Sequence, residues 1–181
     1  MFSGKKGLYT DADIKDALDV YGMTKNLGEI IDDTNLTIRT SIIGPELKEN
    51  GEGLFHWIFS GLNTGGQKGT IINGYEKSLW GGVTTLELAK AVEQCLSYDI
   101  TGLYQLTNGE KISKYELICL IVNQFKLKVF VQKVDGMTTD KSIVPSTRNN
   151  FSFIVPSYAT MIEELYNFMS DHKYLYAFYL E

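Results

Sequence analysis

Hydrophobic and polar residues alternate along the chain with two different periods, one typical of helices and one of strands. The predicted helices cover about residues 17–33, 47–60 and 157–170, and two more begin near 84 and 113. The predicted strands are 35–43, 70–75, 102–106 and 128–134. Helices and strands therefore follow one another in turn, which predicts an α/β fold.

The ends and faces of several predicted helices can be read from the same pattern. Thr84-x-x-Glu87 and Ser113-x-x-Glu116 are capping boxes, each placed directly before an apolar helical repeat. The helix after Thr84 is predicted to bury Leu88, Ala89, Val92, Cys95 and Leu96. The helix over 17–33 is predicted to bury Met23, Leu27, Ile30 and Ile31.

Composition narrows the class of protein. A chain of 181 residues with 44% apolar residues is long enough to form one core. Its net charge is −5 and it has no dense Lys/Arg cluster, which argues against nucleic acid as a partner. No charged leader and no run of eighteen apolar residues occurs, so no membrane span is predicted and we expect a cytoplasmic protein.

Cysteine and histidine do not indicate a metal site. Cys95 and Cys119 stand on apolar helix faces, where a thiol usually acts as a small buried hydrophobe. His56 and His172 have no partner at a spacing suited to metal binding or to a nucleophile–base pair. We therefore predict neither a disulfide nor a bound metal.

Tyr21 and Lys25 stand four residues apart in the first predicted helix. Residues at this spacing share one helix face, with Cβ atoms about 5–6 Å apart. An ammonium beside a phenol favours the phenolate, and such a phenol can exchange a proton with a carbonyl or an alcohol. In a chain of this composition about one such pair is expected by chance. The neighbouring residues therefore carry the information.

Those neighbouring residues resemble a known family. Four segments match in order: FSGKKGLYTDAD…ALDVYGMTKNLGE, TIRTSIIGPE, SLWGGVTTLELAKAVE and GLYQLTNGEKISKYELICLI, within residues 2–122. Together they resemble extended short-chain dehydrogenase/reductases, in particular the dTDP-4-dehydrorhamnose reductase group. The run DKS…TR…PSY…MIEELY from 140 to 166 is similar to the family's C-terminal end. The resemblance implies the C-terminal part of a doubly wound NAD(P)-binding Rossmann-like fold with a small substrate-binding lobe.

The resemblance begins just before the helix that carries Tyr21. A dinucleotide-binding half would open with a strand, a Gly-rich turn and a helix, and the sequence has no such pattern. The family's catalytic Ser or Thr falls before Phe2, and Ser3 lies in the turn that follows it. We therefore expect residues 1–181 to form one unit without the N-terminal dinucleotide-binding half. We expect NAD(P) to be bound by a complete family member and not by this chain alone.

For a complete member, the resemblance implies that a reduced nicotinamide gives hydride to a keto carbon of a nucleotide-linked sugar, in deoxysugar or surface polysaccharide synthesis. Tyr21 would donate the proton to the forming alkoxide. Lys25 would favour ionisation of the Tyr21 phenol and hold the nicotinamide ribose, so both residues are predicted catalytic and cofactor-binding residues.

Three other residues are candidates for contacts to the nucleotide-sugar. Arg39 and Arg148 are the only arginines in the chain, and a guanidinium suits bidentate phosphate binding. Each could instead form a structural ion pair. Trp80 could stack on a sugar or base, or it could serve in the core or at a hinge.

Several interpretations stay open at this point. The chain is either the substrate-binding and partial catalytic portion of a nucleotide-sugar reductase, or a catalytically inactive remnant or subunit completed by a separate dinucleotide-binding chain. An epimerase or dehydratase relative would use the same Tyr and Lys differently, and a homo-oligomer is compatible with all of these. The strand at 36–43 would belong to a parallel sheet whose other strands are missing, so we expect exposed apolar surface there.

Overall fold

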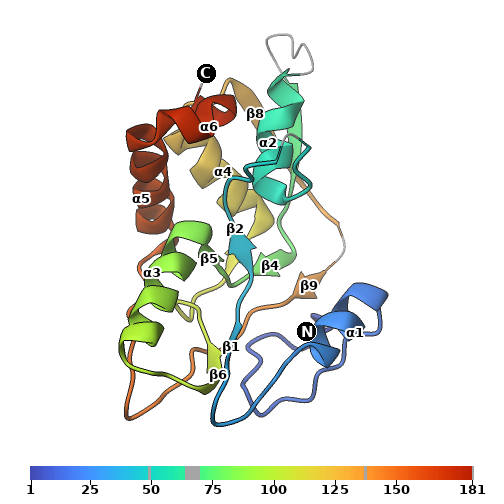
Figure 1. The fold of residues 1–181 in the computed structure, drawn as a ribbon. Helices are drawn as coiled ribbons and strands as arrows, with labels where there is room; N and C mark the ends of the chain where they lie inside the picture. Colours follow the sequence, from blue (N-terminus) through green and yellow to red (C-terminus); the bar gives the residue numbers. More distant parts are fainter. Residues whose placement is uncertain (49, 64–69, 137, 181) are drawn as a thin grey trace.

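The computed structural model describes residues 1–48, 50–63, 70–136 and 138–180 (Figure 1). The helices are α1 (Val20–Leu27), α2 (Leu54–Asn63), α3 (Thr85–Ser97), α4 (Lys114–Gln124), α5 (Tyr158–Asp171) and α6 (Lys173–Leu180). The strands are β1 (Leu36–Arg39), β2 (Ile42–Ile43), β3 (Thr70–Tyr75), β4 (Ser78–Trp80), β5 (Val83–Thr84), β6 (Gly102–Gln105), β7 (Ile112–Ser113), β8 (Val129–Val134) and β9 (Thr139–Asp140).

Strand pairing is mainly parallel and always involves strands that are distant in sequence. β1 pairs with β6, β2 with β5 and β3 with β8, all in parallel, while β4 is antiparallel to β7 and parallel to β9. Parallel pairs joined through helices confirm the predicted α/β class. Within the described residues β1 has β6 as its one neighbour, so its other edge carries no strand.

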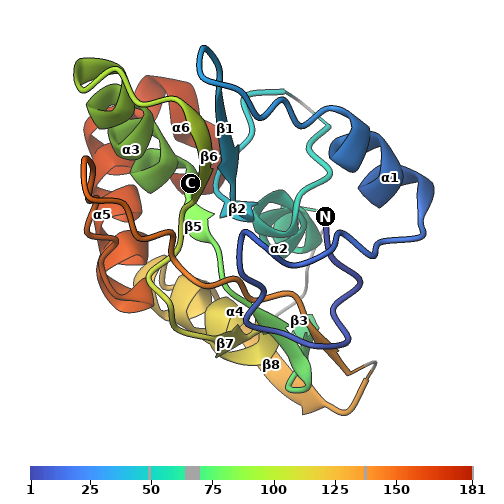
Figure 2. The same ribbon diagram turned by 90° about the horizontal axis from the view of Figure 1, so that it is seen from below.

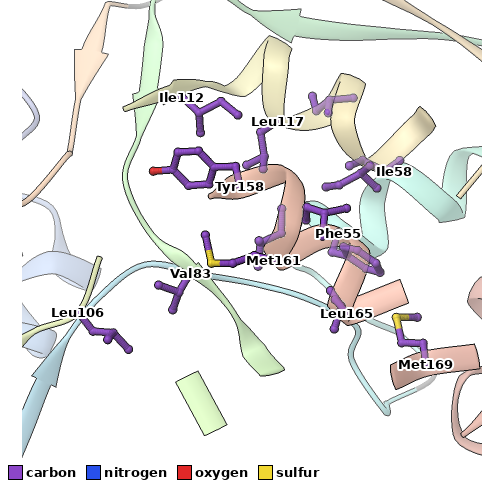
Figure 3. Packing of buried hydrophobic residues seen from close by; sticks show 14 of the residues in the cluster. Phe55, Ile58, Val83, Leu106, Ile112, Leu117, Tyr158, Met161, Leu165 and Met169 are labelled. Carbon is purple, nitrogen blue, oxygen red and sulfur yellow. The ribbon is translucent and has the colours of Figure 1, made fainter. Parts of the chain in front are cut away.

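The core lies where α5 packs against α4, α2 and β5 (Figure 3). Met161, Leu165 and Met169 recur every four residues along α5 and are almost fully buried. They meet apolar side chains from α4 and α2, among them Leu117 and Phe55. Burying one such side chain stabilises the fold by about 1.5–3 kcal/mol. We call α2, α3, α4 and α5 the helical layer, and these helices contribute many residues of the main buried cluster.

The two predicted helix starts are both found, with different cap geometry. Ser113 accepts a hydrogen bond from the Glu116 amide while the Glu116 carboxylate accepts one from the Ser113 amide, which completes the capping box of α4. Thr84 likewise accepts from the Glu87 amide, at 3.2 Å. The Glu87 carboxylate, however, pairs with Lys90 at 3.1 Å. The predicted cap of α3 is thus formed on one side only.

The buried face of α3 differs from the prediction. Ala91 and Cys95 are buried, whereas Val92 and Leu96 are exposed. Positions 87, 91 and 95 repeat every four residues and turn toward α5, so the face is rotated by one position relative to the prediction.

The first predicted helix is the largest correction. α1 covers eight residues in place of 17–33, because the Asp19 side chain caps its start and Gly28 caps its end. Further along, the Asp32 carboxylate accepts hydrogen bonds from the Thr34 and Asn35 amides and holds a turn. The face predicted to be buried is exposed, since nothing within the described residues packs on it. We call residues 14–31 the N-terminal apolar segment. Its exposed members include Ile14, Leu18, Val20, Met23, Leu27, Ile30 and Ile31.

Two further element boundaries differ from the sequence-based expectation. The strand predicted over 35–43 is divided into β1 and β2, which pair with different partners. The helix predicted over 47–60 begins only at Leu54. The Glu46 carboxylate accepts hydrogen bonds from the Glu52 and Gly53 amides, at 2.9 and 2.6 Å, and fixes a loop before the first helical turn.

The aromatic end of the chain forms α6, which packs back on the domain. The buried Tyr179 hydroxyl accepts a hydrogen bond from the Glu46 amide at 2.9 Å and lies 2.9 Å from His56 Nδ1. Tyr174 is exposed. One side of the tail therefore anchors the loop before α2, while the other faces outward.

Some classes of site can be checked directly within the described residues. They contain no group of three His, Cys, Asp or Glu side chains arranged to hold a metal ion. In the same ranges, no helix has the length and apolar character needed to cross a bilayer. Both cysteines are free thiols, with Cys95 buried and Cys119 half-buried.

Candidate active site

The helix α1 sets Tyr21 and Lys25 on one face. Asp19 begins the helix by accepting a hydrogen bond from the Gly22 amide at 2.8 Å. Gly22 is required for this packing, because a Cβ there would lie 2.5 Å from the Ala17 Cβ. One turn apart on the helix, the Lys25 Nζ lies 5.4 Å from the centroid of the Tyr21 ring. The phenol and the ammonium are thus neighbours, as their spacing requires.

Both side chains line one cavity of about 340 Å³. Its lining residues come mainly from α1, the β1–β2 segment and the chain that follows β9. Figures 1 and 2 show that α1 lies on the side of the molecule away from α5. The other residues that line the cavity include Phe2, Glu29, Thr37–Ile42, Gly81, Leu88, Lys141 and Ile143. A tyrosine and a lysine in one partly apolar cavity can bind a small carbonyl compound and donate a proton to it.

Arg39 also reaches this cavity, from the end of β1. Its guanidinium donates to both carboxylate oxygens of Glu29, at 2.9 and 2.8 Å, and Lys15 binds the same carboxylate at 2.9 Å. Burial opposes ionisation of Glu29, but the hydrogen bonds from Arg39 and Lys15 outweigh it and lower the pKa of Glu29. Arg39 thus makes a structural ion pair at the cavity wall, and a substrate contact by it stays a prediction.

Trp80 and Arg148 lie elsewhere. The Trp80 ring packs beside the Tyr158 ring, with centroids 5.8 Å apart. Arg148 donates from Nη1 to the Thr101 carbonyl at 2.6 Å. Neither is among the described residues that line the cavity. The structure therefore does not bring Trp80 and Arg148 together with Tyr21 and Lys25. Their role in substrate binding stays a prediction.

The loop that leads into α1 is held by residues to which sequence reasoning gave no role. The Ser142 Oγ accepts a hydrogen bond from the Leu8 amide at 2.9 Å, and Asp140 binds both Ser142 and Lys111. Gly7 adopts a positive φ of 72°, and a Cβ there would lie 2.1 Å from the Asp140 carboxylate. The Asp-Lys-Ser run at 140–142 therefore fixes the chain beside the cavity. The sequence contains one indication of this role, because the Asp-Lys-Ser run belongs to the segment that is similar to the family's C-terminal end.

Ser3 has no part in the Tyr–Lys pair. Its hydroxyl donates to the Asp16 carboxylate at 2.6 Å, and its amide donates to the same group at 2.7 Å. Ser3 thus fastens the turn to the segment before α1, in agreement with its placement outside the catalytic set.

The parallel strand pairs and the helices that join them define a mixed α/β fold of the Rossmann-like type. Comparison with solved structures gives matches named dTDP-4-dehydrorhamnose reductase. A hypothetical one from Sulfolobus tokodaii is 30% identical over 78% of this chain and 51% of that one, with a TM-score of 0.61. Those from Yersinia enterocolitica and Bacillus anthracis, the latter in complex with NADP, are 18% and 17% identical. They cover 90% and 91% of this chain, with TM-scores of 0.69 and 0.68.

These comparisons confirm the resemblance to dTDP-4-dehydrorhamnose reductases that the sequence indicates. The chain spans 61% of the Yersinia enterocolitica structure and 60% of the Bacillus anthracis one, and about half of the Sulfolobus tokodaii one. No protein-family model matches the sequence. A comparison with curated proteins also gives no match.

Proposed function

We propose that this chain is the substrate-binding and partial catalytic portion of an NAD(P)-dependent nucleotide-sugar reductase of the dTDP-4-dehydrorhamnose reductase type. The observation that carries the proposal is the shared cavity of Tyr21 and Lys25, at the end of a parallel strand pair. The proposal includes a cytoplasmic location and a role in deoxysugar or surface polysaccharide synthesis.

In this proposal the reaction reduces a ketone of the sugar to a secondary alcohol. The reduced nicotinamide, when bound, supplies the hydride to the carbonyl carbon. Tyr21 donates its phenolic proton to the carbonyl oxygen, and the Lys25 ammonium stabilises the phenolate that remains. The apolar part of the cavity wall, including Phe2 and Ile143, limits the access of water.

The residues present fit the cofactor only in part. Lys25 is exposed at the cavity and can donate to ribose hydroxyls. In the part of the chain that the structure describes, no Gly-rich turn joins a parallel strand to a helix N-terminus, which is the usual pyrophosphate site. We therefore propose that a complete cofactor site needs a further dinucleotide-binding unit.

The N-terminal apolar segment supports this part of the proposal. An α/β unit, on the same polypeptide or on a separate one, would cover that segment and add a strand beside β1. Parallel strands are normally buried on both faces, and β1 has β6 as its one partner in the described ranges. Such a unit would bury the exposed side chains of α1 and supply the Gly-rich turn at a helix N-terminus that binds a pyrophosphate.

Turnover by a complemented chain tests the proposal. The chain is expressed with the part of the Bacillus anthracis protein that it does not span, and NADPH oxidation is followed with dTDP-4-dehydrorhamnose as substrate. Tyr21→Phe is expected to lower kcat by about a hundredfold or more, because proton donation is lost. Tyr98→Phe is the matched control, since Tyr98 is 63% exposed and Tyr21 62%.

Equal rates for Tyr21→Phe and Tyr98→Phe would contradict the assignment of the proton donor. Turnover by the chain without any added unit would contradict the need for a separate dinucleotide-binding unit while leaving the role of Tyr21 intact. The two parts of the proposal are therefore tested separately.

A further inference from the structure

Lys141 is a further cation at the cavity, contributed by a segment far from α1 in sequence. It directly follows β9 and lines the same cavity as Tyr21 and Lys25. The stem of Lys141 runs beside Gly4, where an added Cβ would lie 3.0 Å from the Lys141 Cγ. Gly4 has a φ of 85°, a conformation that suits glycine. Backbone geometry on the facing loop thus leaves room for this side chain.

The neighbours of Lys141 hold its backbone in place. Asp140 binds Lys111 at 2.6 Å, and its carboxylate also accepts the Ser142 amide at 3.1 Å. Ser142 in turn accepts a hydrogen bond from the Leu8 amide. Asp140 and Ser142 therefore form hydrogen bonds that fix the loop, while Lys141 between them lines the cavity. A charged side chain on a fixed backbone is well placed to bind a ligand.

The charge balance at the cavity favours an anion. Glu29 is the acidic lining residue, and its carboxylate is already taken by Arg39 and Lys15. Within residues 1–48, 50–63, 70–136 and 138–180, neither Lys25 nor Lys141 forms an ion pair. Two uncompensated ammonium groups thus face one cavity of a chain whose net charge is −5. A local cationic site in an acidic protein concentrates anionic ligands.

We propose that Lys141 is a ligand-binding residue that contacts the diphosphate group of the nucleotide-linked ligand. This inference rests on the proposed function, because it takes the cavity as the place where that ligand binds. Lys25 lies beside Tyr21 at the reacting end, so Lys141 is the lysine of the described cavity lining that is available to the diphosphate. A lysine ammonium binds phosphate as a mobile point charge, which suits its exposed position.

A diphosphate occurs both in a nucleotide-sugar and in a dinucleotide cofactor, and binding measurements distinguish them. The whole chain is titrated by calorimetry with dTDP, thymidine and NADP⁺, before and after Lys141→Gln. We expect dTDP to bind about fivefold more weakly to the variant, as for an exposed charged contact. Thymidine, which has no phosphate, is expected to bind equally to both. Lys128→Gln is the control, because it changes the net charge equally at an exposed lysine outside the cavity.

Weaker binding of dTDP alone would place the nucleotide-sugar diphosphate at Lys141, and weaker binding of NADP⁺ alone would place the cofactor diphosphate there. Either result supports a phosphate contact. Equal affinities for Lys141→Gln and the unchanged chain, equal losses in both lysine variants, or no binding of either phosphate ligand by the unchanged chain would overturn it. These failures are separate from failure of the proposed function, which is decided by turnover that depends on Tyr21.

Discussion

The helical layer and the N-terminal apolar segment are both rich in large hydrophobic residues, yet only one of them is buried. Leu165 in α5 is 2% exposed, whereas Leu27 in α1 is 85% exposed. Figure 2 shows the reason, because α1 projects away from α3, α4 and α5, and no helix or strand of the described residues lies on its outer side. Hydrophobic periodicity therefore marks a face that requires a partner, and it does not state whether the same chain supplies that partner.

The buried helices stabilise the fold, whereas the candidate catalytic residues lie on the exposed N-terminal apolar segment. α4 and α5 contact each other, and α5 also contacts α3 and β5, so their side chains support one another. The segment that carries Tyr21 and Lys25 is held instead by polar contacts, such as those of Asp16 with Ser3 and of Glu29 with Arg39. The candidate catalytic residues thus stand on the less densely packed part of the fold, where local opening requires the least free energy.

Truncation of one leucine in each region tests the comparison most strongly. Leu165→Ala is expected to lower the free energy of unfolding by about 2–5 kcal/mol, because it removes a buried side chain and leaves a cavity. Leu27→Ala is expected to change it by less than about 0.5 kcal/mol, as for an exposed position. Urea denaturation followed by circular dichroism measures both values. A large loss for Leu27→Ala would mean that the segment is covered in solution, for example by a second copy of the chain.

Removing a helix cap in each region tests the same difference with a smaller expected effect on stability. Ser113→Ala removes the cap of α4 and is expected to lower the free energy of unfolding by about 1 kcal/mol. Asp19→Ala removes the cap of α1, and we expect it to leave global unfolding unchanged while the α1 amides exchange with solvent about fivefold faster. Native-state hydrogen exchange distinguishes these effects. Equal global losses would show that α1 unfolds together with the core.

Local sequence patterns predicted an element correctly where the tertiary contacts favour the same element as the pattern. The strand at 70–75 and the capping box at Ser113 were predicted correctly, and the helix predicted at 157–170 is found as α5. The prediction failed where a side-chain hydrogen bond to a loop or a strand distant in sequence decides the structure. The start of α2 depends on the Glu46 carboxylate, and β1 and β2 separate because they pair with different strands. Sequence periodicity does not contain this information.

The candidate site shows the same limit. Tyr21 and Lys25 were singled out because the segments around them resemble a known family, and their spacing within one helix brings the two side chains together locally. Lys141 joins their cavity only through the fold, so no spacing could reveal it, although the segment that contains it was noted for its resemblance. Arg39 was singled out for its chemistry, and the structure adds its bidentate partner Glu29. Pairing across distant segments is what the sequence alone could not provide.

The ion pair between Glu29 and Arg39 links the N-terminal apolar segment to β1, and it leads to a pH-dependent effect on stability. Burial opposes ionisation of Glu29, but the hydrogen bonds from Arg39 and Lys15 bring the pKa of Glu29 below its usual value of 4.5. A carboxylate with a lowered pKa in the folded state stabilises the protein above its unfolded pKa and loses that contribution as pH falls through its folded pKa. The Glu29 and Arg39 side chains are each only 10% exposed, so we expect Glu29→Gln to be less stable than the unchanged chain by about 1 kcal/mol near pH 7. The difference is expected to shrink as pH falls below about 4.5.

Thermal unfolding of the two proteins between acid and neutral pH measures this difference. Glu93→Gln is the control, because Glu93 is exposed and forms no ion pair within the described ranges. A gap between Glu29→Gln and the unchanged chain that stays constant through acid pH would contradict an ionised Glu29 as the source of the stabilisation. A gap that widens in acid would require a raised pKa, which the two cations beside Glu29 oppose. A gap that closes in acid would show that the ion pair holds the N-terminal apolar segment to β1. That link would then be electrostatic, whereas the helical layer is held together by burial of apolar side chains.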